Sequence, residues 1–127
     1  MGTPQQAHLS ADCLECVKFF SMPETNRLEM LTQFLQQNPN DAFTRYGLAM
    51  EYSKLGQIET ALEEFNKLLQ QHPDYTNGYF MAAHTLVKAG RPEDAKKMLN
   101  DGIECAKRTG NRHALSEMSG MLDELGD

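Results

Sequence analysis

The residues of this chain that could perform chemistry begin with two cysteines, Cys13 and Cys16, in the order Cys-Leu-Glu-Cys. Such a pair can act as a redox couple, or as half of a zinc site that needs about two further ligands. No second pair follows, and His8 has no partner motif. A redox role is typical of a β-α-β context, which a helical chain lacks. A thiol- or metal-dependent regulator built on these cysteines is therefore kept only as an alternative.

No arrangement typical of an active site is found elsewhere in the sequence. It contains no set of nucleophile, base and acid, and no glycine-rich loop that could bind phosphate. The acidic pairs Glu63-Glu64 and Glu93-Asp94 are typical of solvated helix faces. The third cysteine, Cys105, is expected to be a small buried side chain. We therefore predict no catalytic residue, no cofactor, no bound metal and no enzymatic activity.

The composition of the chain disfavours two kinds of partner, nucleic acids and membranes. The chain has 127 residues and a net charge of −6, and its 12 basic residues are scattered. Nucleic-acid-binding surfaces normally gather basic side chains into a stripe, so a nucleic-acid partner is disfavoured. No apolar run reaches the roughly 18 to 20 residues of a membrane span, and the N-terminus has no secretory pattern. These features predict a cytoplasmic protein without a membrane partner.

A repeat of 34 residues sets the elements that must position any functional side chain. The segment 34–39, which ends at Pro39, recurs as the segment 68–73, which ends at Pro73. The same spacing relates further identical pairs: Lys54 and Lys88, Gly56 and Gly90, Glu59 and Glu93, Ala61 and Ala95. A fixed period of this size indicates stacked helical hairpins, and such stacks usually present binding surfaces.

Residues that typically cap or end helices recur within the repeat, and they predict where its helices begin and end. Three N-caps are expected, at Asn40 or Asp41, at Asp74 and at Asn111, because their side chains accept hydrogen bonds from the first turn. Gly56 and Gly90 should end the first helix of each hairpin. The resulting division is a tail or extra helix over 1–20 and a repeat domain over 21–127. That domain contains a preceding helix (21–38), two repeats (40–73 and 74–107) and a capping helix (111–126).

The residues of the two repeats resemble the tetratricopeptide-repeat (TPR) family. The first copy matches that family's pattern at Leu48, Ala49, Tyr52, Gly56, Ala61, Phe65 and Pro73. The second matches at Tyr79, Ala82, Ala83, Leu86, Gly90, Ala95 and Leu99. Three positions depart from it. Arg45 stands at the large aromatic position, Gly102 at a contact position and Lys107 at the closing proline. The resemblance implies an all-α fold of helical hairpins in a right-handed superhelix, similar to short bacterial TPR proteins.

In this family the first helix of each hairpin lines a concave groove, and the resemblance carries those groove positions onto this chain. They are Phe43, Tyr46, Met50 and Lys54 in the first copy, and Asn77, Phe80, Met81, His84 and Lys88 in the second. Residues four apart stack along one helix face, so Tyr46, Met50 and Lys54 form one row. The equivalent residues of the second copy form another. Aromatic and methionine side chains are typical of partner-binding surfaces, and the two lysines would suit a carboxylate on a peptide.

These observations predict a non-enzymatic adaptor that binds a protein or peptide in the groove. One alternative is a structural homodimer in which the apolar groove residues are covered by the protein itself. A receptor for chaperone C-termini is disfavoured, because Tyr46 and Met50 stand where the family's carboxylate clamp has Lys and Asn. The partner is not named by the repeat pattern, since a few contacts carry specificity.

Overall fold

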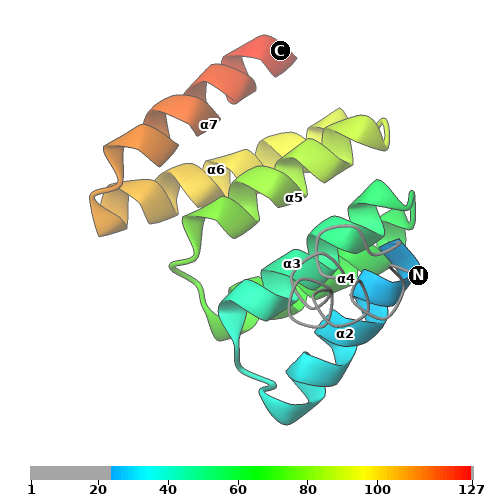
Figure 1. Cartoon of the computed structure of the whole chain (residues 1–127). Helices are drawn as coiled ribbons and strands as arrows, with labels where there is room; N and C mark the ends of the chain where they lie inside the picture. The colour runs from blue at the N-terminus through cyan, green and yellow to red at the C-terminus, as the bar shows by residue number, and fades with distance from the viewer. Residues whose placement is uncertain (1–23, 127) are drawn as a thin grey trace, which may run out of the picture.

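The computed structural model describes residues 24–126, and within that range the chain forms six α-helices and no strand (Figure 1). In chain order they are α2 (Glu24–Gln37), α3 (Ala42–Lys54), α4 (Ile58–Gln71), α5 (Thr76–Lys88), α6 (Pro92–Thr109) and α7 (Arg112–Leu125). The all-α prediction is confirmed. The predictions for residues 1–23, which include those for Cys13, Cys16 and the tail or extra helix over 1–20, lie outside the described residues.

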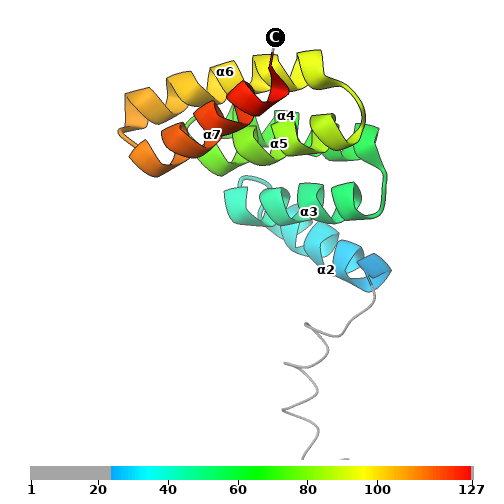
Figure 2. The same cartoon turned by 90° about the horizontal axis from the view of Figure 1, so that it is seen from above.

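The helices are arranged as stacked hairpins. α3 packs against α4 and α5 packs against α6, while α2 lies against α3 at one end of the stack and α7 against α6 at the other (Figures 1 and 2). The first helices of successive hairpins also touch, α3 against α5 and α5 against α7. α3, α5 and α7 therefore follow one another along one face of the stack.

Small side chains allow the two helices of each hairpin to approach closely. Ala49 and Ala61 share the core of the first hairpin, and Ala83 and Ala95 share that of the second; all four are 0% exposed. Phe65 fills the space left in the first cluster and is also fully buried. This pattern explains why the repeat requires alanine at these positions, since a larger side chain would overpack the contact.

Most of the predicted helix caps and helix ends are confirmed. Gly56 and Gly90 follow α3 and α5 with φ of 82° and 76°, in the left-handed region that glycine enters cheaply. The side chains of Asp41 and Asn111 accept hydrogen bonds from the backbone of Thr44 and Ala114. Asp74 is not a cap, and that prediction is wrong. Tyr75 occupies the N-cap position of α5 without a side-chain bond, and the Asp74 carboxylate instead accepts a 2.7 Å hydrogen bond from Arg108 of α6.

Two departures from the family pattern have a physical explanation. Arg45, at the aromatic position, is buried and donates to Glu64 at 2.6 Å and to the Pro39 carbonyl at 3.1 Å. The equivalent Tyr79 donates to the Pro73 carbonyl at 2.9 Å, so both repeats tie this position to the preceding proline. Gly102 lies where α6 meets its neighbours. A Cβ there would be 2.7 Å from Tyr79 Cβ and 2.5 Å from Met118 Sδ.

Candidate functional site

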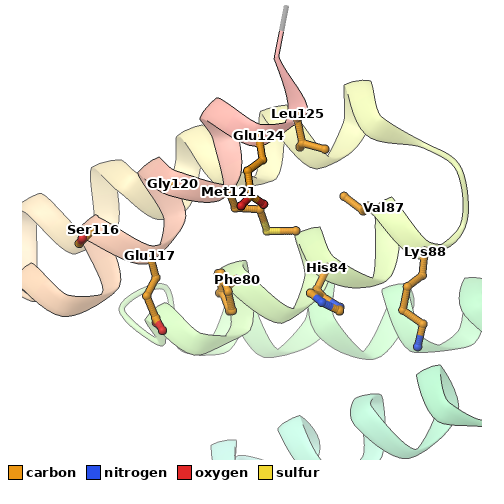
Figure 3. A pocket seen from close by; sticks show the side chains of 10 residues that line it. All are labelled: Phe80, His84, Val87, Lys88, Ser116, Glu117, Gly120, Met121, Glu124 and Leu125. Carbon is orange, nitrogen blue, oxygen red and sulfur yellow. The ribbon is translucent and has the colours of Figure 1, made fainter.

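Three of the predicted groove residues line one cleft. Phe80, His84 and Lys88 follow one another along α5, and together with Val87 they form one wall of a cleft of about 510 Å³ (Figure 3). Phe80 and Val87 are half-buried, whereas His84 and Lys88 are exposed. The row predicted for the second copy therefore borders a real concavity.

The opposite wall of this cleft comes from α7. It is lined by Ser116, Glu117, Gly120, Met121, Glu124 and Leu125 (Figure 3). Ser116 and Gly120 are small, and a Cβ built at Gly120 meets no atom within 4 Å. The lack of a side chain at Gly120 therefore leaves the middle of the cleft open.

This second wall is not among the sequence predictions, although a spacing in the sequence points to it. Positions 116, 120 and 124 of α7 lie 36 residues after Phe80, His84 and Lys88, instead of 34. α6 is four residues longer than α4, but the turn that follows it is two residues shorter, so α7 begins two residues later than the repeat requires. A period of 36 residues in place of 34 aligns α7 with α5, and this alignment marks α7 as a further first helix of the stack.

The orientation of α7 follows from its apolar side. Met118 is 0% exposed and packs with Ala114 in the core cluster formed by α5 and α6. Leu115 and Leu122 are half-buried against the same cluster. Anchoring α7 on this side directs Ser116 and Gly120, which occupy other positions of the helix, toward α5 and the cleft. α7 thus packs on the core with one side and borders the cleft with another.

The row predicted for the first copy is partly built into the core. The Tyr46 ring packs edge-on against Phe65, with centroids 6.4 Å apart, and at a tilt against Tyr75, with centroids 5.5 Å apart. Burial raises the pKa of both tyrosine hydroxyls, and it is the leading cause in each. Met50 packs against the same cluster. Lys54 Nζ lies 3.6 Å from Glu51 at the exposed end of the row.

The remaining predicted groove residues do not line the α5–α7 cleft. Phe43 is 75% exposed at the start of α3, and Asn77 is exposed at the start of α5. Met81 is half-buried and packs against the cluster that contains Phe65 and Leu68. The structure thus gathers Phe80, His84 and Lys88 at one cleft and distributes the other predicted residues over the surface and the core.

The charges around the cleft differ between its two walls. His84 and Lys88 come from α5, and Glu117 and Glu124 come from α7. Glu117 lies 3.4 Å from His113 of its own helix, whereas Lys88 forms no ion pair with any residue of the range 24–126. Within that range no three His, Cys, Asp or Glu side chains are grouped as metal ligands. The cleft is suited to bind an apolar group with charged flanks.

The remaining cysteine of the described chain is structural. Cys105 is 1% exposed, and its thiol donates to the Pro73 carbonyl at 3.4 Å. Burial raises the pKa of the thiol, which keeps it protonated and unreactive. The prediction of a small buried side chain is confirmed for Cys105.

Stacked hairpins with an open cleft between their first helices define a helical-repeat protein. A family model described as tetratricopeptide repeat matches residues 52–117, and a second with the same description matches residues 22–81. The first match covers just over half of the chain, so the chain belongs to the tetratricopeptide-repeat family. Proteins of this family are generally non-enzymatic protein-interaction modules.

Relatives support the same assignment. A TPR repeat-containing protein of Pseudomonas aeruginosa is 28% identical over 77% of this chain and 93% of its own length. The solution structure of a tetratricopeptide repeat domain protein from Salinibacter ruber is 33% identical, with a TM-score of 0.65 over 69% of this chain and 89% of that one. The TPR2B domain of yeast Sti1 shares the fold at 18% identity, with a TM-score of 0.76 over 85% of this chain and 86% of that one.

None of the helices within residues 24–126 is both long and apolar enough to cross a membrane.

Proposed function

We propose that this protein binds a peptide segment of a partner protein along α3, α5 and α7, with the α5–α7 cleft as the anchoring point. The observation that carries the proposal is the open space over Gly120 between the Phe80–His84–Lys88 row and α7. Its volume of about 510 Å³ lies within the 300–1,000 Å³ of typical binding pockets. The TPR2B domain of yeast Sti1, which shares this fold, was solved in a complex with pHsp70.

The lining of the cleft suggests the chemistry of the segment. Phe80, Val87 and Met121 are half-buried, so each keeps apolar surface that a ligand can cover. Burial of one apolar side chain contributes about 1.5–3 kcal/mol, which makes an apolar anchor over Gly120 the main source of affinity. Lys88 has no acidic partner among residues 24–126, so an acidic side chain of the ligand is expected on the α5 side.

Site-specific photocrosslinking in the native cell tests this proposal. A photoreactive amino acid replaces His84, which borders the cleft, or Gln70, which is exposed on α4 outside it. We expect position 84 to crosslink a discrete partner and position 70 to yield no such product. Peptide mapping of the product should then give a segment with apolar side chains. Equal crosslinking from both positions would contradict the cleft as the anchoring point.

A homodimer is the second candidate, and exposed apolar side chains favour it. Met30, Phe34 and Phe43 are 43%, 52% and 75% exposed. Light scattering over a dilution series tests this candidate, because a single monomer mass at every concentration would exclude it.

The thiol- or metal-dependent regulator on Cys13 and Cys16 stays a hypothesis. It would be removed if native mass spectrometry of protein purified without chelator finds no bound metal and if thiol blocking leaves partner binding unchanged.

A further inference from the structure

A second cleft lies between the second helices of the two hairpins, α4 and α6. It has a volume of about 280 Å³, and α5 contributes Leu86 to its lining. Leu86 is two positions from both His84 and Lys88, which line the α5–α7 cleft, and two positions turn a helix by about 200°. The α4–α6 cleft therefore lies on the opposite side of α5 from the α5–α7 cleft.

Part of the lining of the α4–α6 cleft is apolar and close to the core. Leu62 of α4 and Leu86 of α5 are 9% and 4% exposed, and Met98 of α6 is half-buried. Met98 packs against both core clusters, the one that contains Phe65 and the one that contains Leu99. Because methionine is unbranched and flexible, it adapts to the shape of a neighbouring side chain. This part of the cleft is suited to an apolar side chain.

Charged side chains make up most of the remaining lining, and carboxylates outnumber cations. Four carboxylates line the cleft, whereas only Arg91 and Lys97 carry a positive charge. At the start of α6, Arg91 lies 2.9 Å from Glu59 and 3.2 Å from Asp94. The charges at this end of the cleft are therefore engaged in ion pairs within the protein.

Beyond the first turn of α6 the cleft keeps an excess of negative charge. The charged side chains there are Glu63, Lys97 and Asp101, and all three are exposed. None of the three forms an ion pair with a residue of the range 24–126. Two carboxylates against one ammonium attract a cation and repel an acidic group.

We propose that the α4–α6 cleft docks a basic segment of a second partner protein. One apolar side chain of that segment packs on Leu62, Leu86 and Met98, and an adjacent arginine or lysine binds Glu63 and Asp101. Charge complementarity selects this occupant over an acidic or a neutral segment. Because the two clefts lie on opposite sides of α5, a segment in one leaves the other open. The protein then joins two partners.

The length of the cleft sets the size of the segment. On α4 the lining runs from Glu59 to Asn66, which corresponds to about 10 Å along the helix axis. An extended chain covers that distance with about three or four residues. A short peptide that alternates leucine and arginine therefore supplies both kinds of side chain to the cleft.

Nuclear magnetic resonance titration of the full chain with such a peptide tests the proposal. The probe is a capped six-residue peptide of alternating leucine and arginine. We expect backbone amide signals of residues 59–66 and 94–101 to shift, while those of residues 116–125 on α7 stay in place. Peptides with glutamine for each arginine, or with serine for each leucine, should shift them less. An absence of shifts with the basic peptide, or shifts centred on α7, would overturn the proposal.

Charge variants separate docking in the cleft from general attraction to an acidic protein. Glu63→Gln/Asp101→Asn should weaken peptide binding at least about fivefold, because it removes both unpaired carboxylates. Glu29→Gln/Glu104→Gln is the matched control, since it removes two exposed carboxylates outside the cleft. Equal weakening by the two double variants would refute the cleft as the docking site. Shifts of residues 59–66 on concentrating the protein without peptide would identify a second copy as the occupant, and that result also overturns the proposal.

A variant of the other cleft keeps this test independent of the proposed function. Gly120→Leu fills the α5–α7 cleft, so it should leave binding of the basic peptide unchanged. Loss of peptide binding in this variant would contradict two separate docking surfaces.

Discussion

Two glycines that sit inside helices should respond in opposite directions to the same substitution. Gly120 lies in the interior of α7, is exposed, and has no atom within 4 Å of a built Cβ. Glycine in a helix interior costs about 0.5–1 kcal/mol relative to alanine, so Gly120→Ala should raise the free energy of unfolding by that amount. For a domain of this size the gain corresponds to a rise in Tm of roughly 2–8 °C.

Gly102→Ala is the matched contrast, because the space around it is filled. The added methyl would meet Tyr79 Cβ at 2.7 Å, and this atom is fixed to the backbone of α5. Overpacking of this kind costs about 1–3 kcal/mol, which exceeds the gain in helix propensity. We expect a net loss on the order of 1–2 kcal/mol.

Urea unfolding followed by circular dichroism measures both changes with one protocol. The m-value should stay constant, so that the midpoint reports stability alone. A destabilised Gly120→Ala variant would refute the assignment of open space beside α7. A stabilised Gly102→Ala variant would refute the close approach of α6 to Tyr79.

The remaining predictions concern stability and its dependence on pH. Arg45→Ala should lower the free energy of unfolding by on the order of 3 kcal/mol, because it leaves the mostly buried Glu64 without its 2.6 Å partner. Lys67→Ala, which removes an exposed cation 3.7 Å from the same Glu64, should cost less than about 1 kcal/mol in the same urea titration. Burial raises the folded-state pKa of Tyr46 above its ordinary value of 10.0, so the stability from the protonated hydroxyl is present below pH 10 and is lost as pH rises through the folded-state pKa. Urea titrations at pH 9 and 11 should therefore show a smaller loss in Tyr46→Phe than in the unmodified protein, and an equal loss would contradict the buried position of this hydroxyl.

The repeat architecture could be predicted because its determinants are local. Gly56 and Gly90 end helices through a backbone conformation that few other residues adopt, and Asp41 and Asn111 cap through bonds to residues three positions ahead. Asp74 shows the limit of such reasoning. The Asp74 carboxylate accepts a hydrogen bond from Arg108, which lies 34 residues away, and no local sequence pattern indicates this distant partner.

The candidate site was less predictable, because it depends on how separate helices meet. The row Tyr46, Met50 and Lys54 has the same spacing as the row Phe80, His84 and Lys88. Tyr46, however, packs against the ring of Tyr75, which lies at the start of α5. The wall formed by Ser116 and Gly120 was missed because α6 extends to Thr109 and shifts α7 by two residues relative to the repeat. Small residues carry no pattern that marks them as part of a cleft.

Calorimetric titration of the crosslinked segment is the sharpest test of whether a partner segment is anchored in the α5–α7 cleft. Gly120→Leu adds a side chain where a Cβ meets no atom within 4 Å, so it should fill the cleft without disturbing the core. Asp123→Leu adds the same side chain to an exposed position of α7 that does not line the cleft. If a segment binds there, Gly120→Leu should weaken binding at least about tenfold, equivalent to roughly 1.4 kcal/mol, while Asp123→Leu binds as the unmodified protein does. Unchanged affinity in Gly120→Leu would contradict it.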